Sequence, residues 1–214
     1  MFDKALATTL VQLTNVAYAT HANREAPMPL GPWVIESQLY LNEWGQTPFG
    51  FIASVGRALY IVCRGTDTLM EWIDDSVVLL VPCLGGKCCW GFKGLVDQLL
   101  PQIQEVVNRF KPATIFMAGH SAGGAVVTLL QQNFPAAITY SFCSPRVGDP
   151  ALAQFLSSHV HFRCHNSEDA VVQVPFAEDL YMHTGTPIEV TFNGRSPAGN
   201  HDLNNLIGAI NLNY

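Results

Sequence analysis

Hydrophobic residues recur with a helical period near the N-terminus. Phe2, Leu6, Leu10, Leu13 and Ala17 are three or four residues apart, so they line one face of a predicted amphipathic helix that packs on the rest of the domain. Apolar segments separated by turn residues follow a loop that is rich in Pro and Gly. We expect these segments to be strands over Glu36–Asn42, Gly50–Val55 and Ala58–Cys63.

Predicted strands and helices alternate in the second half of the chain. Several of these strands are apolar on both sides, which is typical of a parallel sheet that helices cover on both faces. The expected order is helix Gly94–Phe110, strand Thr114–Ala118, helix Ala122–Asn133, strand Ile138–Cys143, helix Pro150–Ser157, strand Val160–His165, hairpin-like strand Ile188–Phe192 and a terminal helix from about Asp202. The pattern predicts one α/β domain over residues 1–214, with a central, mostly parallel sheet.

Composition excludes several classes of protein. Hydrophobic residues make up 49% of the 214 residues and charged residues only 13%, which is unlike a disordered chain. The 11 basic and 17 acidic side chains give a net charge of −6 without any basic cluster, so we expect no nucleic-acid partner. No apolar run is long enough for a transmembrane segment.

The N-terminus and the cysteines leave the cellular compartment open. Ala5–Ala19 imitates a secretory signal, but Asp3 and several polar residues within the segment favour the amphipathic helix. The chain thus carries no convincing signal peptide, and secretion would need a leader that has been removed. Cys83, Cys88 and Cys89 share one Gly-containing loop, where a disulfide is possible and a zinc site is the weaker alternative. The other three cysteines are expected to be small buried residues.

The segment Gly119-His120-Ser121-Ala122-Gly123 carries the clearest chemical signal. It lies between a predicted strand and a predicted helix, which is the setting of the G-x-S-x-G nucleophile elbow. The turn is so tight that the serine takes a strained backbone conformation and the flanking positions need glycine. We therefore expect the Ser121 hydroxyl to be a nucleophile at a helix N-terminus, where developing negative charge is favoured.

A serine nucleophile needs a histidine base that a carboxylate orients, in the chain order Ser, Asp or Glu, His. His201 lies in a polar loop before the last predicted helix and is the favoured base, with His183 as the alternative. Asp169 follows a predicted strand and is the favoured acid, with Glu168 as the alternative. Weaker candidates are Asp149 and Asp179 for the acid, and His159, His161 and His165, which are expected strand residues without enough partners for a metal site.

At this point the chain resembles the class 3 lipases, the filamentous-fungal lipase type of α/β-hydrolase, from about Phe49 to Asn205. Alanine stands at 122 where the family has leucine, and the histidine of its H-x-G-F motif is replaced. Six segments carry the resemblance, in this order: Ile61–Thr66 for F-R-G-[ST], Glu71–Asp75 for [DN]-W-x-x-D, Trp90–Phe92 for H-x-G-F, Ile115–Gly124 for V-T-G-H-S-L-G-G, Phe142–Asp149 for F-G-S-P-R-V-G-[ND] and Asn166–Pro175 for N-x-x-D-x-V-x-x-[LV]-P.

The resemblance implies roles for individual residues. The family's catalytic acid and base fall on Asp169 and His201, in agreement with the reading above, and His183 falls on a structural position. The backbone amides of Thr66 and Ala122 are implied as the oxyanion hole, with the Thr66 hydroxyl as a further donor. A short lid follows the F-R-G-[ST] motif in the family, and its apolar residues here would be Leu69, Met70, Trp72 and Ile73, for which ordinary core contact is the alternative.

The sequence therefore predicts a carboxylic ester hydrolase of the α/β-hydrolase fold that acts through an acyl-enzyme, and most specifically an acylglycerol lipase. The expected partner is a small ester or lipid substrate, with a lipid–water interface as a possible site of action. No metal or organic cofactor is required by this chemistry. The alternatives are a phospholipase A1, a feruloyl-type esterase, or a non-catalytic binding protein on the same fold.

Overall fold

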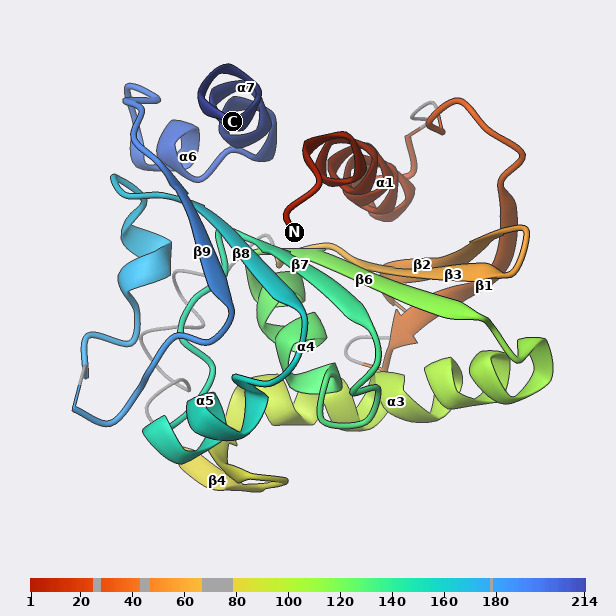
Figure 1. The fold of residues 1–214 in the computed structure, drawn as a ribbon, viewed down its shortest axis with the longest axis horizontal. Helices are drawn as coiled ribbons and strands as arrows, with labels where there is room; N and C mark the ends of the chain where they lie inside the picture. The colour runs from red at the N-terminus through yellow and green to blue at the C-terminus, as the bar shows by residue number, and fades with distance from the viewer. Residues whose placement is uncertain (25–27, 43–46, 67–78, 178) are drawn as a thin grey trace.

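A seven-stranded sheet forms the centre of the molecule (Figure 1). The structure, a computed structural model, describes residues 1–24, 28–42, 47–66, 79–177 and 179–214. The strands of the sheet lie in the order β1-β2-β3-β6-β7-β8-β9. Their bounds are β1 Val34–Leu41, β2 Thr47–Val55, β3 Ala58–Cys63, β6 Thr114–His120, β7 Ile138–Phe142, β8 His161–Asn166 and β9 Thr186–Val190.

The sheet is mostly parallel, as predicted from the apolar strands. β1, β2 and β3 are joined as antiparallel neighbours, whereas β3, β6, β7, β8 and β9 run parallel to one another. The expectation of a hairpin-like last strand was wrong, because β9 pairs with β8 in parallel from Phe162↔Thr186 to Asn166↔Val190. A connection of some twenty residues separates the two strands, and that length permits a crossover where a short turn would force a hairpin.

Helices cover both faces of the sheet (Figure 1). One face is covered by α1, α6 and α7, and the other by α3 and α4 with α5 beside them. Both faces of the sheet are apolar because each one packs against helices. In β3, for example, Ile61 packs in the core under α3 and α4, and the next residue, Val62, packs in the core under α1 and α7. The helix bounds are α1 Lys4–His21, α3 Trp90–Phe110, α4 Ala122–Leu130, α5 Pro150–Leu156, α6 Pro197–Asn200 and α7 Leu203–Asn213.

The N-terminal segment is the amphipathic helix that its spacing predicts. Leu10, Leu13 and Ala17 are buried on one face of α1, and the side chain of Asp3 caps the helix by accepting a hydrogen bond from the amide of Leu6 at 3.0 Å. Tyr140 lies below the start of the helix, where its hydroxyl accepts a hydrogen bond from the Asp3 amide at 3.2 Å. The first residues are thus an integral part of the fold.

Some elements differ from the sequence expectation. The segment with three cysteines is a hairpin of β4 Leu80–Cys83 and β5 Gly86–Cys89, not a loop, and it leads directly into α3, which begins at Trp90 instead of Gly94. All six cysteines carry free thiols. The loop expected before His201 contains the short helix α6. The proposed lid residues Leu69, Met70, Trp72 and Ile73 lie outside the described residues.

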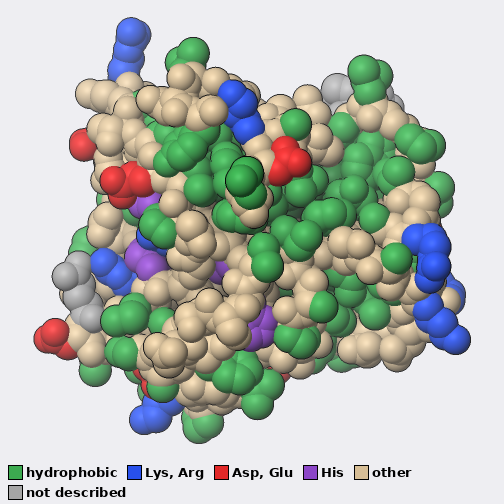
Figure 2. Space-filling view, viewed as in Figure 1, with side chains coloured by type: hydrophobic (Ala, Val, Ile, Leu, Met, Phe, Trp, Pro, Cys, Tyr) green, Lys and Arg blue, Asp and Glu red, His purple; other side chains and the backbone are tan. Residues whose placement is uncertain are grey.

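The described surface agrees with the low content of charge. On the face shown in Figure 2, basic side chains are few, and hydrophobic side chains extend over much of the area between them. None of the helices in the described part of the chain has both the length and the apolar character of a membrane span.

Candidate active site

Ser121 lies in the turn between β6 and α4, at the carboxyl end of the sheet. Its backbone has φ 57° and ψ −126°, a conformation that an L-residue adopts only under strain. The Ser121 amide donates a hydrogen bond to the carbonyl oxygen of Phe142 at 2.9 Å, which ties the turn to the end of β7. The strained serine between strand and helix is the geometry of a nucleophile elbow.

Glycine is required on both sides of this turn for steric reasons. A Cβ atom on Gly119 would collide with the backbone of Gly123, and one on Gly123 would collide with the carbonyl oxygens of Cys63 and Arg64 at the end of β3. Gly65 passes so close to the serine that a Cβ there would lie 2.7 Å from the Ser121 Cβ. The turn can therefore form against β3 only because these positions carry no side chain.

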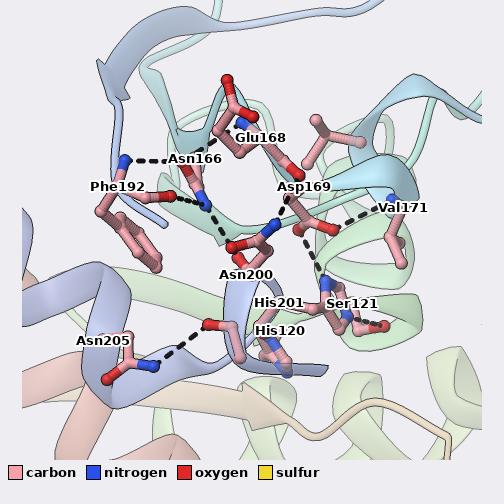
Figure 3. Close-up of polar contacts among 12 residues, drawn as sticks. His120, Ser121, Asn166, Glu168, Asp169, Val171, Phe192, Asn200, His201 and Asn205 are labelled. Carbon is pink, nitrogen blue, oxygen red and sulfur yellow. Dashed lines mark hydrogen bonds and ion pairs between the residues drawn. The ribbon is translucent and has the colours of Figure 1, made fainter. Parts of the chain in front are cut away.

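His201 and Asp169 complete a chain of contacts that begins at Ser121 (Figure 3). Ser121 Oγ lies 2.9 Å from His201 Nε2, and His201 Nδ1 lies 2.7 Å from Asp169 Oδ2. The other carboxylate oxygen of Asp169 accepts a hydrogen bond from the Val171 amide at 3.0 Å. An ionised carboxylate only accepts, so Nδ1 of His201 carries the proton and Nε2 accepts from the serine hydroxyl.

The alternative acids and bases lie elsewhere. His183 Nε2 donates to the carbonyl oxygen of Val172 at 2.8 Å, and burial lowers the pKa of His183 to about 3. The Glu168 side chain is exposed, and Asp149 caps α5 by accepting a hydrogen bond from the amide of Leu152 at 2.9 Å. His161 is buried against Ser141, and the ring of His165 contacts Glu189. Of the candidates, the structure brings Asp169 and His201 to the serine.

Two asparagines that the sequence analysis did not single out hold the His201 segment in place (Figure 3). The Asn166 amide group donates to the carbonyl oxygens of Phe192 and Asn200 at 3.0 and 3.2 Å, and its oxygen accepts from the Phe192 amide at 3.1 Å. The Asn200 side chain donates to the carbonyl oxygen of Glu168 at 3.0 Å. These bonds join the segment that carries the acid to the segment that carries the base. Two signals could have indicated Asn166, its position at the end of an apolar strand and its place as the first residue of the N-x-x-D segment.

A third missed residue is Tyr18, which reaches the site from α1. Its hydroxyl lies 2.7 Å from His120 Nδ1 and accepts a hydrogen bond from the Gly65 amide at 2.8 Å. The His120 Nε2 atom lies 2.9 Å from the carbonyl oxygen of His201 and must donate to it, so Nδ1 accepts the proton of Tyr18. Burial lowers the pKa of His120 to about 3, with a smaller contribution from His201, so this ring is neutral at pH 7.

Cys143 is a fourth residue at the site that sequence reasoning did not assign to it. It follows β7, is fully buried and has φ 49°, in the left-handed region that favours glycine. Burial and the Asp169 carboxylate, to which the thiol donates a hydrogen bond, raise the pKa of Cys143 well above its usual range. The F-G-S-P-R pattern that this segment resembles has glycine at this position. The replacement of that glycine by Cys143 is the sequence signal that could have drawn attention to this residue.

The residues expected at the oxyanion hole lie next to Ser121. Ala122 is the first residue of α4, where an amide has no acceptor within the helix. Thr66 follows Gly65, and its Oγ1 atom is buried without a hydrogen-bond partner among the described residues. A buried, unpaired hydroxyl close to the serine is a donor available to a substrate oxygen.

Comparison with known families and proteins gives one consistent result. The model of the family "Lipase (class 3)" matches residues 60–179, more than half of the chain. A secreted mono- and diacylglycerol lipase A from Penicillium camembertii is 26% identical over 178 residues, which cover 76% of this chain and 58% of that protein. A lipase from Rhizomucor miehei is 27% identical over 155 residues, which cover 64% of this chain and 43% of that protein. This chain thus spans less than two thirds of the length of these curated relatives.

Solved structures show the same fold. The lipase of Rhizopus microsporus var. chinensis superposes with a TM-score of 0.73 at 22% identity, over 89% of this chain and 75% of that one. The Lip2 lipase of Yarrowia lipolytica superposes with a TM-score of 0.71 at 19% identity, over 96% of this chain and 91% of that one. At such identities the similarity supports the fold, and it agrees with the predicted α/β-hydrolase architecture.

Proposed function

Because this chain belongs to the class 3 lipase family, we propose that it hydrolyses carboxylic esters of lipids, with acylglycerols as the main substrate class. The observation that carries the proposal is the continuous contact from Ser121 Oγ through the His201 ring to Asp169, with distances of 2.9 and 2.7 Å. A relative named as a mono- and diacylglycerol lipase supports the choice of acylglycerols.

In the proposed mechanism, His201 Nε2 takes the proton of Ser121 as its oxygen attacks the ester carbonyl. Asp169 holds the ring in the required tautomer and stabilises its charged form. The protonated His201 then gives its proton to the leaving alcohol, which leaves an ester on Ser121. Water attacks this ester by the same proton transfers in reverse and releases the fatty acid, so the proposed steps use protein groups and water alone.

The oxyanion hole is proposed to consist of the amides of Thr66 and Ala122 with the Thr66 hydroxyl. These donors flank Ser121, because Gly65 lies against the serine and Ala122 follows it. Loss of one such donor costs about 2.7–4 kcal/mol of transition-state stabilisation in other hydrolases. The roles of Leu69, Met70, Trp72 and Ile73 as a lid, and action at a lipid–water interface, stay part of the proposal.

The test combines covalent labelling with a substrate series. A fluorophosphonate should label wild type at Ser121 and should fail to label Ser121→Ala and His201→Ala, while His183→Ala, the matched control, keeps most of the labelling. Hydrolysis of monoolein, diolein and triolein should exceed hydrolysis of phosphatidylcholine and methyl ferulate.

Other outcomes would assign a different function. Preference for the phospholipid or for the ferulate would replace the acylglycerol by that substrate class. Absence of both labelling and hydrolysis in wild type would make the chain a binding protein on a hydrolase fold. Labelling that is lost in His183→Ala but kept in His201→Ala would assign the base to His183.

A further inference from the structure

Three side chains with metal-binding atoms gather at the base of the proposed triad. His120, Cys143 and His201 each offer one ligand atom, and these atoms all lie within 4.8 Å of one another. The rings of His120 and His201 lie beside each other (Figure 3), tilted by 38° and with their centroids 4.6 Å apart. A thiol and two imidazoles favour soft and borderline metal ions, whereas carboxylate and carbonyl oxygens favour harder ions.

The thiol is held in this place by the backbone. The Cys143 amide donates to the carbonyl oxygen of Cys164 at 2.9 Å, and the carbonyl of the preceding residue, Phe142, accepts from the Ser121 amide at 2.9 Å. Cys143 is therefore fixed to β8 on one side and to the nucleophile on the other. The thiol stands where the related motif has glycine, so the donor set belongs to this chain and not to the motif.

We propose that His120, Cys143 and His201 bind one thiophilic cation of the Cu⁺ or Ag⁺ class, and that the bound ion blocks His201. With the bond lengths of Zn²⁺, about 2.3 Å to sulfur and about 2.1 Å to nitrogen, one ion reaches donors up to about 4.4 Å apart. The ligand atoms of this cluster lie within 4.8 Å of one another, which suits a larger ion such as Ag⁺. The ion replaces the proton of the Cys143 thiol, which goes to solvent, and it takes one lone pair from each histidine ring, with the ring proton on the other nitrogen. His120 thereby gives up the hydrogen bond at the nitrogen that binds the ion, to Tyr18 or to the carbonyl oxygen of His201. The exposed edge of His201, whose side chain is 18% accessible, gives the ion its approach.

Blockage follows from the contacts of His201. Its two ring nitrogens face Ser121 and Asp169, so an ion on either nitrogen breaks the chain of proton transfer. This inhibition rests on the proposed function, whereas binding of the ion does not. The two parts can therefore fail separately.

The experiment compares wild type with Cys143→Gly, which places the residue of the related motif in a backbone that suits it. Silver nitrate in chloride-free buffer is the probe, and calorimetry measures bound equivalents. Fluorophosphonate labelling, normalised to each protein without silver, measures blockage. Cys143→Gly should bind one equivalent fewer than wild type and should need at least tenfold more silver for half-maximal blockage. The thiols of Cys83, Cys88 and Cys89 are present in both proteins. Silver bound to them therefore does not contribute to the difference in bound equivalents between wild type and Cys143→Gly.

Cys63→Ala is the matched control, because Cys63 is another fully buried thiol, at the end of β3. It should block at the same silver concentration as wild type. Equal binding and equal blockage in Cys143→Gly and wild type would overturn the proposal, as would a tenfold shift in Cys63→Ala. If Cys143→Gly does not fold, Cys143→Ser replaces it, since a hydroxyl is a poor ligand for silver and should give the same loss. If wild type is never labelled, the calorimetric difference alone decides whether the site exists.

Discussion

The serine side and the histidine side of the site are built in different ways. The serine side, residues 114–124, is one strand, one turn and the start of one helix, and its position follows from close backbone contacts within the turn and against Cys63 and Arg64 at the end of β3. The histidine side, residues 166–169 and 192–202, joins distant segments through asparagine side chains. One side is fixed by steric exclusion and the other by polar contacts over long range.

Burial sets His201 apart from the other two members of the proposed triad. Ser121 is only 2% exposed and Asp169 only 1%, whereas the His201 side chain is 18% exposed and lies between two helices, one of them a single turn long. A closely packed turn resists any added atom, because neighbouring backbone cannot yield. A hydrogen-bonded segment can shift by a fraction of an ångström when one bond is lost. Substitutions on the two sides should therefore fail in different ways.

The largest effect is expected from Gly123→Ala on the serine side. The new Cβ would meet the backbone carbonyls of Cys63 and Arg64, and strands cannot move apart without breaking the sheet. We expect the free energy of unfolding to fall by about 1–3 kcal/mol or more, as in other overpacked sites. Displacement of the helix start should lower kcat/KM at least about 100-fold. Urea unfolding and ester hydrolysis measure the two effects.

Gly94→Ala is the control for that substitution. Gly94 lies inside α3, and a Cβ there meets nothing within 4 Å. Alanine in an open helical position should stabilise the protein by about 0.5–1 kcal/mol and leave hydrolysis unchanged. A Gly123→Ala variant as stable and as active as Gly94→Ala would mean that the turn is not sterically fixed, and the distinction between the two sides would disappear.

A smaller effect is expected from Asn166→Ala on the histidine side. Asn166 is fully buried, and its loss leaves the amide and the carbonyl of Phe192 without their partner. Each unpaired buried group costs about 1–3 kcal/mol, which a small shift of the segment or an entering water reduces. We expect kcat to fall about 10- to 100-fold with little change in KM, because His201 loses its orientation while the surface around the serine is kept.

Asn205→Ala provides the comparison. Asn205 is exposed, and its side chain donates one hydrogen bond to the carbonyl oxygen of Gly199 at 3.1 Å on the same segment (Figure 3). Its loss should change stability by no more than about 0.5 kcal/mol and kcat less than twofold. If KM rises in Asn166→Ala and kcat stays constant, Asn166 acts on substrate binding and not on the orientation of His201.

The division also explains how far the sequence could predict the site. Ser121 could be predicted from Gly119 and Gly123, because both glycines lie within the five residues of the motif, although Gly123 is required by a contact with Cys63 and Arg64. Asp169 and His201 could be ranked by chain order and by the related motif, but their contact depends on the packing of segments 32 residues apart. Asn166 and Cys143 stand at positions of the related motifs, but their roles, like that of Tyr18, depend on tertiary contacts that the motifs do not specify. The parallel pairing of β9 escaped prediction for the same reason, since periodicity does not give strand direction.

The smallest effect is expected from Tyr18→Phe, which tests a contact from α1 that reaches both sides. The hydroxyl binds the Gly65 amide next to the proposed oxyanion hole and orients His120, which in turn holds the carbonyl of His201. Phenylalanine keeps the ring and leaves the Gly65 amide unpaired, so we expect a loss of about 1–2 kcal/mol in stability and about tenfold in kcat. Affinity for a boronic acid, which forms a charged adduct with the serine, should fall by a similar factor.

Tyr60→Phe is the control, because the Tyr60 ring is stacked on Phe116 with centroids 4.9 Å apart, and this variant should leave boronate affinity unchanged. A Tyr18→Phe variant that loses stability but keeps full boronate affinity would show that the hydroxyl only supports the fold.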